Sequence, residues 1–171
     1  MGSLDLMLLS NSVTTISTSA SVLIPRPRDE VFAVVTDGTN ATLLRPRGPF
    51  AGISKVEMHE GQTLATGSKR RVIMTDGSVL EEEILAFDPP VRYRYGWTGG
   101  VKFPFSLLVR SGGGNWDFAE EAGGTRIVWT YTFGLTSPLA YPLAVPIAQL
   151  FKGWLQQGLD ALRSEILAGG R

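Results

Sequence analysis

The sequence predicts an α+β domain in which a curved antiparallel sheet of about seven strands wraps around one long C-terminal helix. Two observations predict this fold: β-branched and aromatic runs separated by turn residues over 53–133, and a change to helical periodicity after them. A chain of 171 residues that is 43% hydrophobic and 19% charged suits one folded domain. We therefore expect a single domain over residues 13–171 and a flexible N-terminal arm over residues 1–12.

A strand and two short helices open the domain. The run from Val13 to Ile24 is rich in β-branched residues and predicts the first strand. Pro27 suits the first turn of a helix, and the apolar residues after it predict a helix that ends near Asp37-Gly38. The run GTNATLL predicts a second short helix, which ends before Pro46.

Strands then follow one another, separated by turn residues such as Asp76-Gly77 and Asp88-Pro89-Pro90. The predicted strands contain, in order, ISKVEMHE, GSKRRVIMT, SVLEEEILAF, VRYRYGW, NWDFAEE and TRIVWTYTF. Residues 103–110 are expected to begin the strand that resumes near Asn115, with the run SGGGN between them as a bulge or loop.

The last part of the chain predicts a long amphipathic helix. Its apolar residues recur at intervals of three and four: Leu139, Leu143, Ile147, Leu150, Phe151, Trp154, Leu155, Leu162 and Ile166. Pro142 and Pro146 each remove a helical hydrogen bond, so we expect an irregular or bent segment up to about Pro146 and a straight helix beyond it. The two prolines, together with Gln149 and Lys152, argue against a stable membrane span in this apolar stretch.

Composition narrows the range of functions. Sixteen basic and sixteen acidic residues give a formal net charge of zero, which argues against nucleic acid as a partner. The absence of cysteine excludes disulfides and cysteine-ligated zinc and fits a cytoplasmic setting. The single histidine, His59, makes a histidine-rich metal site improbable, so we expect no metal and no cofactor. The sequence leaves open whether the chain forms a homodimer.

Four segments of the sequence resemble the polyketide cyclase/dehydrase branch of the START-like (SRPBCC) superfamily. These segments are VLIPRPRDEVFAVVTD, EEILAFDPPVRYRY, GGTRIVWTYTF and LDALRSEI. The resemblance covers residues 13–167 and implies the helix-grip fold, in which the sheet encloses the last helix. It also implies a deep, mostly apolar cavity between sheet and helix, as in aromatic polyketide cyclases and in lipid and hormone carriers. These motifs mark the fold more than a chemistry, because one fold hosts many activities.

Three consecutive glutamates lie in the strand SVLEEEILAF, so Glu82 must point to the opposite face from Glu81 and Glu83. If Asp76-Gly77 forms a two-residue hairpin turn, Arg71 lies opposite Glu82. Burying one carboxylate costs less than burying two, and the family resemblance places its recurrent glutamate at Glu82. We therefore expect Arg71 and Glu82 to point into the cavity as a pair, which is either structural or in contact with a ligand.

Aromatic residues gather on single faces of the predicted strands and of the last helix. If these faces meet, they form an aromatic interior that suits a mostly hydrophobic ligand with a few polar groups. The predicted ligand-binding residues are Arg71, Glu82, Tyr93, Tyr95, Trp97, Trp116, Trp129, Tyr131, Phe151 and Trp154.

The sequence favours binding of a small hydrophobic or aromatic molecule, such as a lipid or polyketide, without chemistry. The alternative is an aromatase/cyclase or dehydratase acting on a polyketide-like carbonyl compound, for which Glu82, Arg71, Tyr93 and Tyr95 would supply acid–base and enolate-stabilising groups. No residues are assigned as catalytic. A third alternative is an interaction module, which an exposed apolar patch on residues 139–145 would favour.

Overall fold

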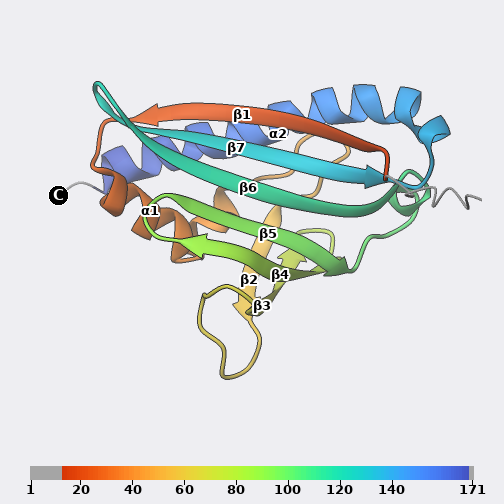
Figure 1. Ribbon diagram of the computed structural model, residues 1–171, viewed down its shortest axis with the longest axis horizontal. Helices are drawn as coiled ribbons and strands as arrows, with labels where there is room; N and C mark the ends of the chain where they lie inside the picture. Colours follow the sequence, from red (N-terminus) through yellow and green to blue (C-terminus); the bar gives the residue numbers. More distant parts are fainter. Residues whose placement is uncertain (1–12, 170–171) are drawn as a thin grey trace, which may run out of the picture.

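The computed structural model describes residues 13–169, so the expected arm over residues 1–12 lies outside the described residues. A seven-stranded antiparallel sheet has the strand order β1-β7-β6-β5-β4-β3-β2. Its strands are β1 (Thr15–Ile24), β2 (Ile53–Met58), β3 (Lys69–Met74), β4 (Val79–Asp88), β5 (Arg92–Gly99), β6 (Val109–Glu121) and β7 (Gly124–Leu135). Figure 1 shows the long helix α2 (Tyr141–Ala168) along one face of this sheet, which confirms the predicted helix-grip fold.

The two short helices after β1 are present as predicted. Helix α1 (Arg28–Thr36) begins directly after Pro27, whose missing N–H is not needed in a first helical turn. The chain then reverses at Gly38, which has a φ of 84°, and continues as the 3₁₀ helix η1 (Thr39–Leu43). Short 3₁₀ helices also precede β6 (η2, Phe105–Leu107) and α2 (η3, Pro138–Ala140).

The glycine run SGGGN lies within strand β6 and is not a loop, whereas a bulge is present at its start, where the pairing with β7 shifts register between Val109 and Ser111. Strand β6 continues through Gly112, Gly113 and Gly114, which pair with Phe133, Thr132 and Tyr131 of β7. Aromatic rings of the neighbouring strands explain the glycines: a Cβ on Gly112 would lie 2.7 Å from the Trp97 ring. Glycine at position 112 therefore leaves room for the Trp97 ring while the strand continues.

Helix α2 begins earlier than expected. It is continuous from Tyr141, with Pro142 in its first turn, where an N–H is not required, and Pro146 inside the helix. The irregular part is limited to the three residues of η3. No helix within residues 13–169 combines the length and hydropathy needed to cross a bilayer.

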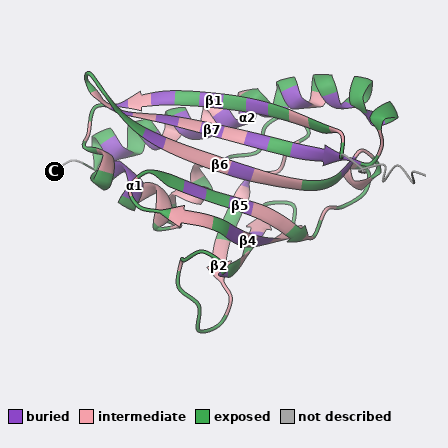
Figure 2. Ribbon diagram, in the orientation of Figure 1, coloured by how far each residue is buried: buried purple, intermediate pink, exposed green. Residues whose placement is uncertain are grey.

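The core lies between the inner face of the sheet and α2. Figure 2 shows buried positions that alternate with intermediate or exposed ones along β1 and β7, as expected for a sheet with one covered face. The fully buried members include Ile24, Ile84, Ile127, Leu155 and Leu159.

Candidate functional site

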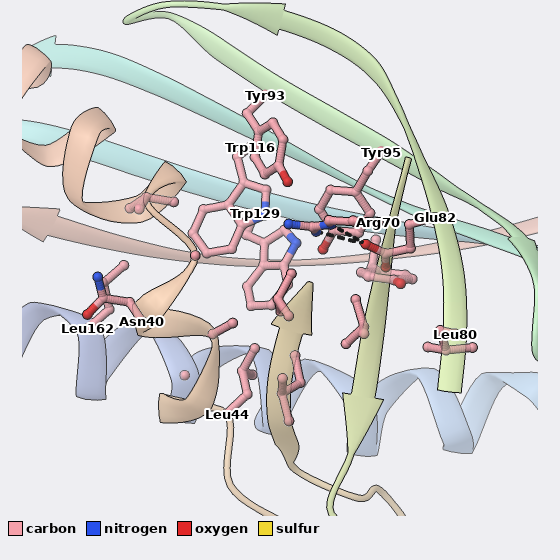
Figure 3. Close-up of a pocket in the computed structure, with 18 of the residues that line it drawn as sticks. Asn40, Leu44, Arg70, Leu80, Glu82, Tyr93, Tyr95, Trp116, Trp129 and Leu162 are labelled. Carbon is pink, nitrogen blue, oxygen red and sulfur yellow. Dashed lines mark hydrogen bonds and ion pairs between the residues drawn. The ribbon is translucent and has the colours of Figure 1, made fainter. Parts of the chain in front are cut away.

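A cavity of about 100 Å³ lies between the inner face of the sheet, the helix α2 and the segment around η1 (Figure 3). The sheet contributes the polar and aromatic part of its wall: Arg70, Glu82, Tyr93, Tyr95, Trp116, Trp129 and Tyr131. Aliphatic residues from β2, β3 and β4 line it further, as do Asn40 and Leu44 near η1 and Trp154, Gly158 and Leu162 of α2. The site is therefore mainly apolar, and apart from Asn40 its polar side chains lie on the sheet wall.

Arg70 and Glu82 form a buried ion pair in this wall. The Arg70 Nε and Nη2 atoms each lie 2.8 Å from Glu82 Oε2. The Arg70 side chain is 13% exposed and the Glu82 side chain 4%. The guanidinium also lies over two rings, 4.8 Å from the Tyr95 centroid and 5.5 Å from the Tyr93 centroid. Carboxylate and rings together offset the cost of burying the cation.

The structure corrects the expected partner of Glu82, because Arg70 and not Arg71 lies opposite it. The turn between β3 and β4 has three residues, since the Met74 N–H donates to the Ser78 carbonyl at 2.8 Å. Its third residue, Gly77, has a φ of 79°, which is typical of a three-residue hairpin loop. The extra residue shifts the register by one, so Arg71 points outward and lies 3.8 Å from Glu81.

Burial controls the ionisation of this wall. It raises the pKa of the Glu82 carboxyl above its ordinary value, and the Arg70 guanidinium opposes that shift. Burial also disfavours the Arg70 charge, but the Glu82 carboxylate together with Tyr93 and Tyr95 outweighs this, so the Arg70 pKa is raised. Burial raises the pKa of Tyr93 to about 12 and raises that of Tyr95 as well, so both hydroxyls remain protonated near neutral pH.

The aromatic residues of the wall pack on one another. The Trp116 and Trp129 rings stack with centroids 4.2 Å apart, and Tyr95 lies between Tyr93 (5.6 Å) and Tyr131 (6.2 Å). A Cβ on Gly114 would lie 2.5 Å from the Tyr95 ring and 3.0 Å from Trp129 Nε1. The packing of Tyr95 and Trp129 in the wall therefore requires glycine at position 114.

Two hydrogen-bond donors of the wall have no acceptor among the described residues. These are the Tyr93 hydroxyl and Trp129 Nε1, and both side chains are almost completely buried. Figure 3 shows them near the Arg70 guanidinium, on the same wall of the cavity. An unmet buried donor costs on the order of 1–3 kcal/mol, so these two donors are the unsatisfied polar groups of this wall.

The structure brings most of the predicted site residues to the cavity. Those that line it are Glu82, Tyr93, Tyr95, Trp116, Trp129, Tyr131 and Trp154. Three do not: Arg71 is on the outer face, Trp97 packs against Tyr131 and Phe133, and Phe151 packs against Phe50 and Tyr131. Contact between the lining residues and a ligand stays a prediction.

Sequence reasoning missed Arg70, Asn40 and Leu44. A three-residue reading of the turn Thr75–Gly77 would have found Arg70, because Gly77 occupies the position that favours positive φ. Asn40 and Leu44 lie at and just after a short 3₁₀ helix, which gives no periodic signal of the face it buries.

Residues 15–166 match the family described as polyketide cyclase / dehydrase and lipid transport. The match covers most of the chain, and the protein belongs to this family, within the START-like superfamily that its sequence resembles. No curated protein is significantly similar to the chain in sequence.

Solved structures share the fold at low sequence identity. The protein TTHA0849 from Thermus thermophilus is 22% identical, with a TM-score of 0.65 over 91% of this chain and 100% of that one. The di-domain ARO/CYC protein BexL of the BE-7585A biosynthetic pathway is 24% identical, with a TM-score of 0.66 over 96% of this chain and 53% of BexL. Norcoclaurine synthase from Thalictrum flavum, in complex with dopamine and hydroxybenzaldehyde, is 14% identical, with a TM-score of 0.69 over 94% and 91% of the two chains.

Proposed function

We propose that the protein binds a small, mainly aromatic molecule in the cavity between the sheet and α2, and that this molecule presents a neutral oxygen acceptor. The observation that carries the proposal is the pair of buried donors without acceptors, the Tyr93 hydroxyl and Trp129 Nε1, in a wall that is aromatic apart from the Arg70–Glu82 ion pair. Family membership and the fold shared with BexL and norcoclaurine synthase support a ligand-binding cavity at this place.

The charge of the wall favours a neutral ligand. Glu82 already neutralises Arg70, so a carboxylate bound beside them would bring a buried anion without a free cation as partner. A carbonyl or ether oxygen accepts the same hydrogen bonds without that cost.

The size of the cavity limits a ligand to at most about one ring unless the wall moves. A cavity of roughly 150 Å³ is enough for benzene. The cavity here, at about 100 Å³, is smaller, so even a single ring fits tightly and a larger polyketide or lipid requires the wall to move outward.

Three single-ring probes test the proposal by titration of the intrinsic fluorescence of the cavity tryptophans. Acetophenone should bind more tightly than ethylbenzene, which lacks the oxygen, and more tightly than benzoate, which is charged. Tyr93→Phe should weaken acetophenone about five- to tenfold, the loss expected for one neutral hydrogen bond, and should leave ethylbenzene unchanged. Tyr141→Phe, which removes a hydroxyl outside the cavity, is the matched control. Equal affinity for all three probes would refute the proposed acceptor.

The second candidate is an aromatase/cyclase or dehydratase with Glu82 as the proton-transferring group. The raised pKa of this buried carboxyl in the cavity wall favours it, because acid–base catalysis near neutral pH needs such a shift. Glu82→Gln should then abolish turnover of a polyketide-like ketone while its binding persists. Retained turnover in Glu82→Gln would rule out this role.

A further inference from the structure

One end of the molecule exposes large apolar side chains that the fold does not use. Leu139 of η3 is 87% exposed, and Leu143 and Leu150 of α2 are 61% and 56% exposed. The spacing of seven residues places Leu143 and Leu150 on one stripe of α2, which differs from the buried stripe of Ala144 and Ala148, and Leu139 lies in η3 directly before this helix. Figure 2 shows exposed positions over these first turns of α2. Such a stripe marks an interaction surface rather than core.

The connection between β5 and β6 adds two further apolar residues to this end, Phe103 and Leu107, which are 77% and 63% exposed. It lies against the segment between β7 and η3, because the Thr136 hydroxyl donates to the Leu107 carbonyl at 2.8 Å. Phe105 and Leu108 line a small apolar crevice together with Ala144 and Ile147. Figure 1 shows the connection and the first turns of α2 at the same end of the sheet. We call Phe103, Leu107, Leu139, Leu143 and Leu150 the apolar end.

Basic residues accompany the apolar end. Lys102 precedes Phe103, Lys152 follows Leu150 by two residues, and Arg47 lies against α2, 3.4 Å from where a Cβ on Gly153 would be. The described residues provide no ion-pair partner within 4.0 Å for Arg47, Lys102 or Lys152.

Acidic residues are missing from the segments that build this end. Residues 38–56, 89–116 and 122–159 contain no Asp and no Glu, although the whole chain is neutral. Hydrogen bonds from Ser78 and then the charge of Lys102 lower the pKa of Asp76, so this carboxylate at the β3–β4 turn offsets part of one lysine charge. The apolar end is therefore locally basic.

We propose that the apolar end docks on the surface of a membrane that contains anionic lipids. Exposed leucines and a phenylalanine enter the boundary between head groups and acyl chains, while the basic residues beside them contact the anionic head groups. A second copy of the chain fits less well. A two-fold interface would bring the same basic patch of both copies together.

Co-sedimentation of the full-length protein with vesicles tests this docking. We expect binding to phosphatidylcholine vesicles that contain phosphatidylglycerol, weaker binding to phosphatidylcholine alone, and a decrease as salt is raised. The double variant Leu139→Ser, Leu143→Ser should lose about tenfold or more in vesicle affinity, because two apolar anchors are removed. Lys102→Glu with Lys152→Glu should lose binding to the anionic vesicles selectively.

Matched controls separate docking from general loss of structure. Leu85→Ser and Arg94→Glu change exposed residues of β4 and β5 that are not part of the apolar end, and they should bind as the unchanged protein does. Circular dichroism confirms that each variant is folded. An equal loss of binding in the controls, or no binding to either vesicle, would overturn the proposal.

Two further measurements would show that the apolar end contacts something other than a membrane. If vesicle binding is absent from the full chain and appears only after residues 1–12 are deleted, those residues cover the apolar end and the proposal is wrong. If light scattering shows a dimer that Leu139→Ser with Leu143→Ser dissociates, a second copy is the partner instead.

Discussion

Two arginine–glutamate pairs occupy consecutive positions of β3 and β4 but lie on opposite faces of the sheet. The inner pair, Arg70 and Glu82, is 13% and 4% exposed with a contact of 2.8 Å, whereas the outer pair, Arg71 and Glu81, is 53% and 39% exposed with a contact of 3.8 Å. Water screens the attraction between the two charges of the outer pair. In the inner pair each charge is buried, so its stability depends on the opposite charge and, for Arg70, on the rings of Tyr93 and Tyr95. The same two residue types therefore serve as a surface contact in one case and as the polar wall of a cavity in the other.

The largest difference between the pairs is expected when one partner is removed. Glu82→Ala should lower the free energy of unfolding by about 3–5 kcal/mol, because the Arg70 guanidinium is left buried without a carboxylate. Glu81→Ala should cost about 0–1 kcal/mol. Urea denaturation of the two variants measures both values. Similar losses would show that the inner pair is not energetically distinct.

Replacing both partners of a pair removes the ion pair without leaving an unpaired buried charge. Because Arg70→Met with Glu82→Leu leaves no buried charge, the double variant should be more stable than Glu82→Ala, with a coupling energy on the order of 2–3 kcal/mol in a double-mutant cycle. The outer pair should couple by less than about 1 kcal/mol in the cycle of Arg71→Met and Glu81→Leu. Equal coupling energies in the two cycles would contradict the difference in burial.

Glycines beside the two pairs extend the comparison to packing. Gly114→Ala should cost about 1–3 kcal/mol in the free energy of unfolding, because the new methyl group meets the Tyr95 ring and Trp129 Nε1. Gly99→Ala places its methyl group 4.0 Å from Glu81 on the outer side and should change stability by less than about 0.5 kcal/mol. Thermal unfolding followed by circular dichroism provides the measurement. An unchanged free energy of unfolding in Gly114→Ala would show that the Tyr95 and Trp129 side chains can move to accommodate the methyl group.

The smallest expected effect is on the pH dependence of stability. Burial raises the Glu82 pKa above 4.5, so in the window between 4.5 and the raised value the native state holds a proton that the unfolded chain releases. The stability of the unchanged protein relative to Glu82→Gln should therefore increase as the pH falls through this window, by at most about 1.4 kcal/mol per pH unit. Denaturation of both proteins from neutral to acidic pH checks this. A relative stability that increases with pH would reverse the assigned direction.

Local sequence patterns predicted the parts of the fold that depend on local periodicity. The alternation around Glu82 and the three- and four-residue spacing after Leu139 each reflect a single element, and both elements are present. The glycine strand was missed because Gly112 and Gly114 are explained by rings on β5 and β7, which are distant in sequence. Arg70 was missed because one residue of turn length decides which face a side chain occupies.

The turn Thr75–Gly77 therefore has an effect out of proportion to its size. Deleting one of its residues would shift β3 against β4 and exchange the inward set Arg70, Val72 and Met74 for Lys69, Arg71 and Ile73. A single codon gained or lost at this turn is thus equivalent to three simultaneous substitutions in the cavity wall. Among natural homologues, insertions and deletions at this position would diversify the ligand more effectively than point mutations in the wall itself.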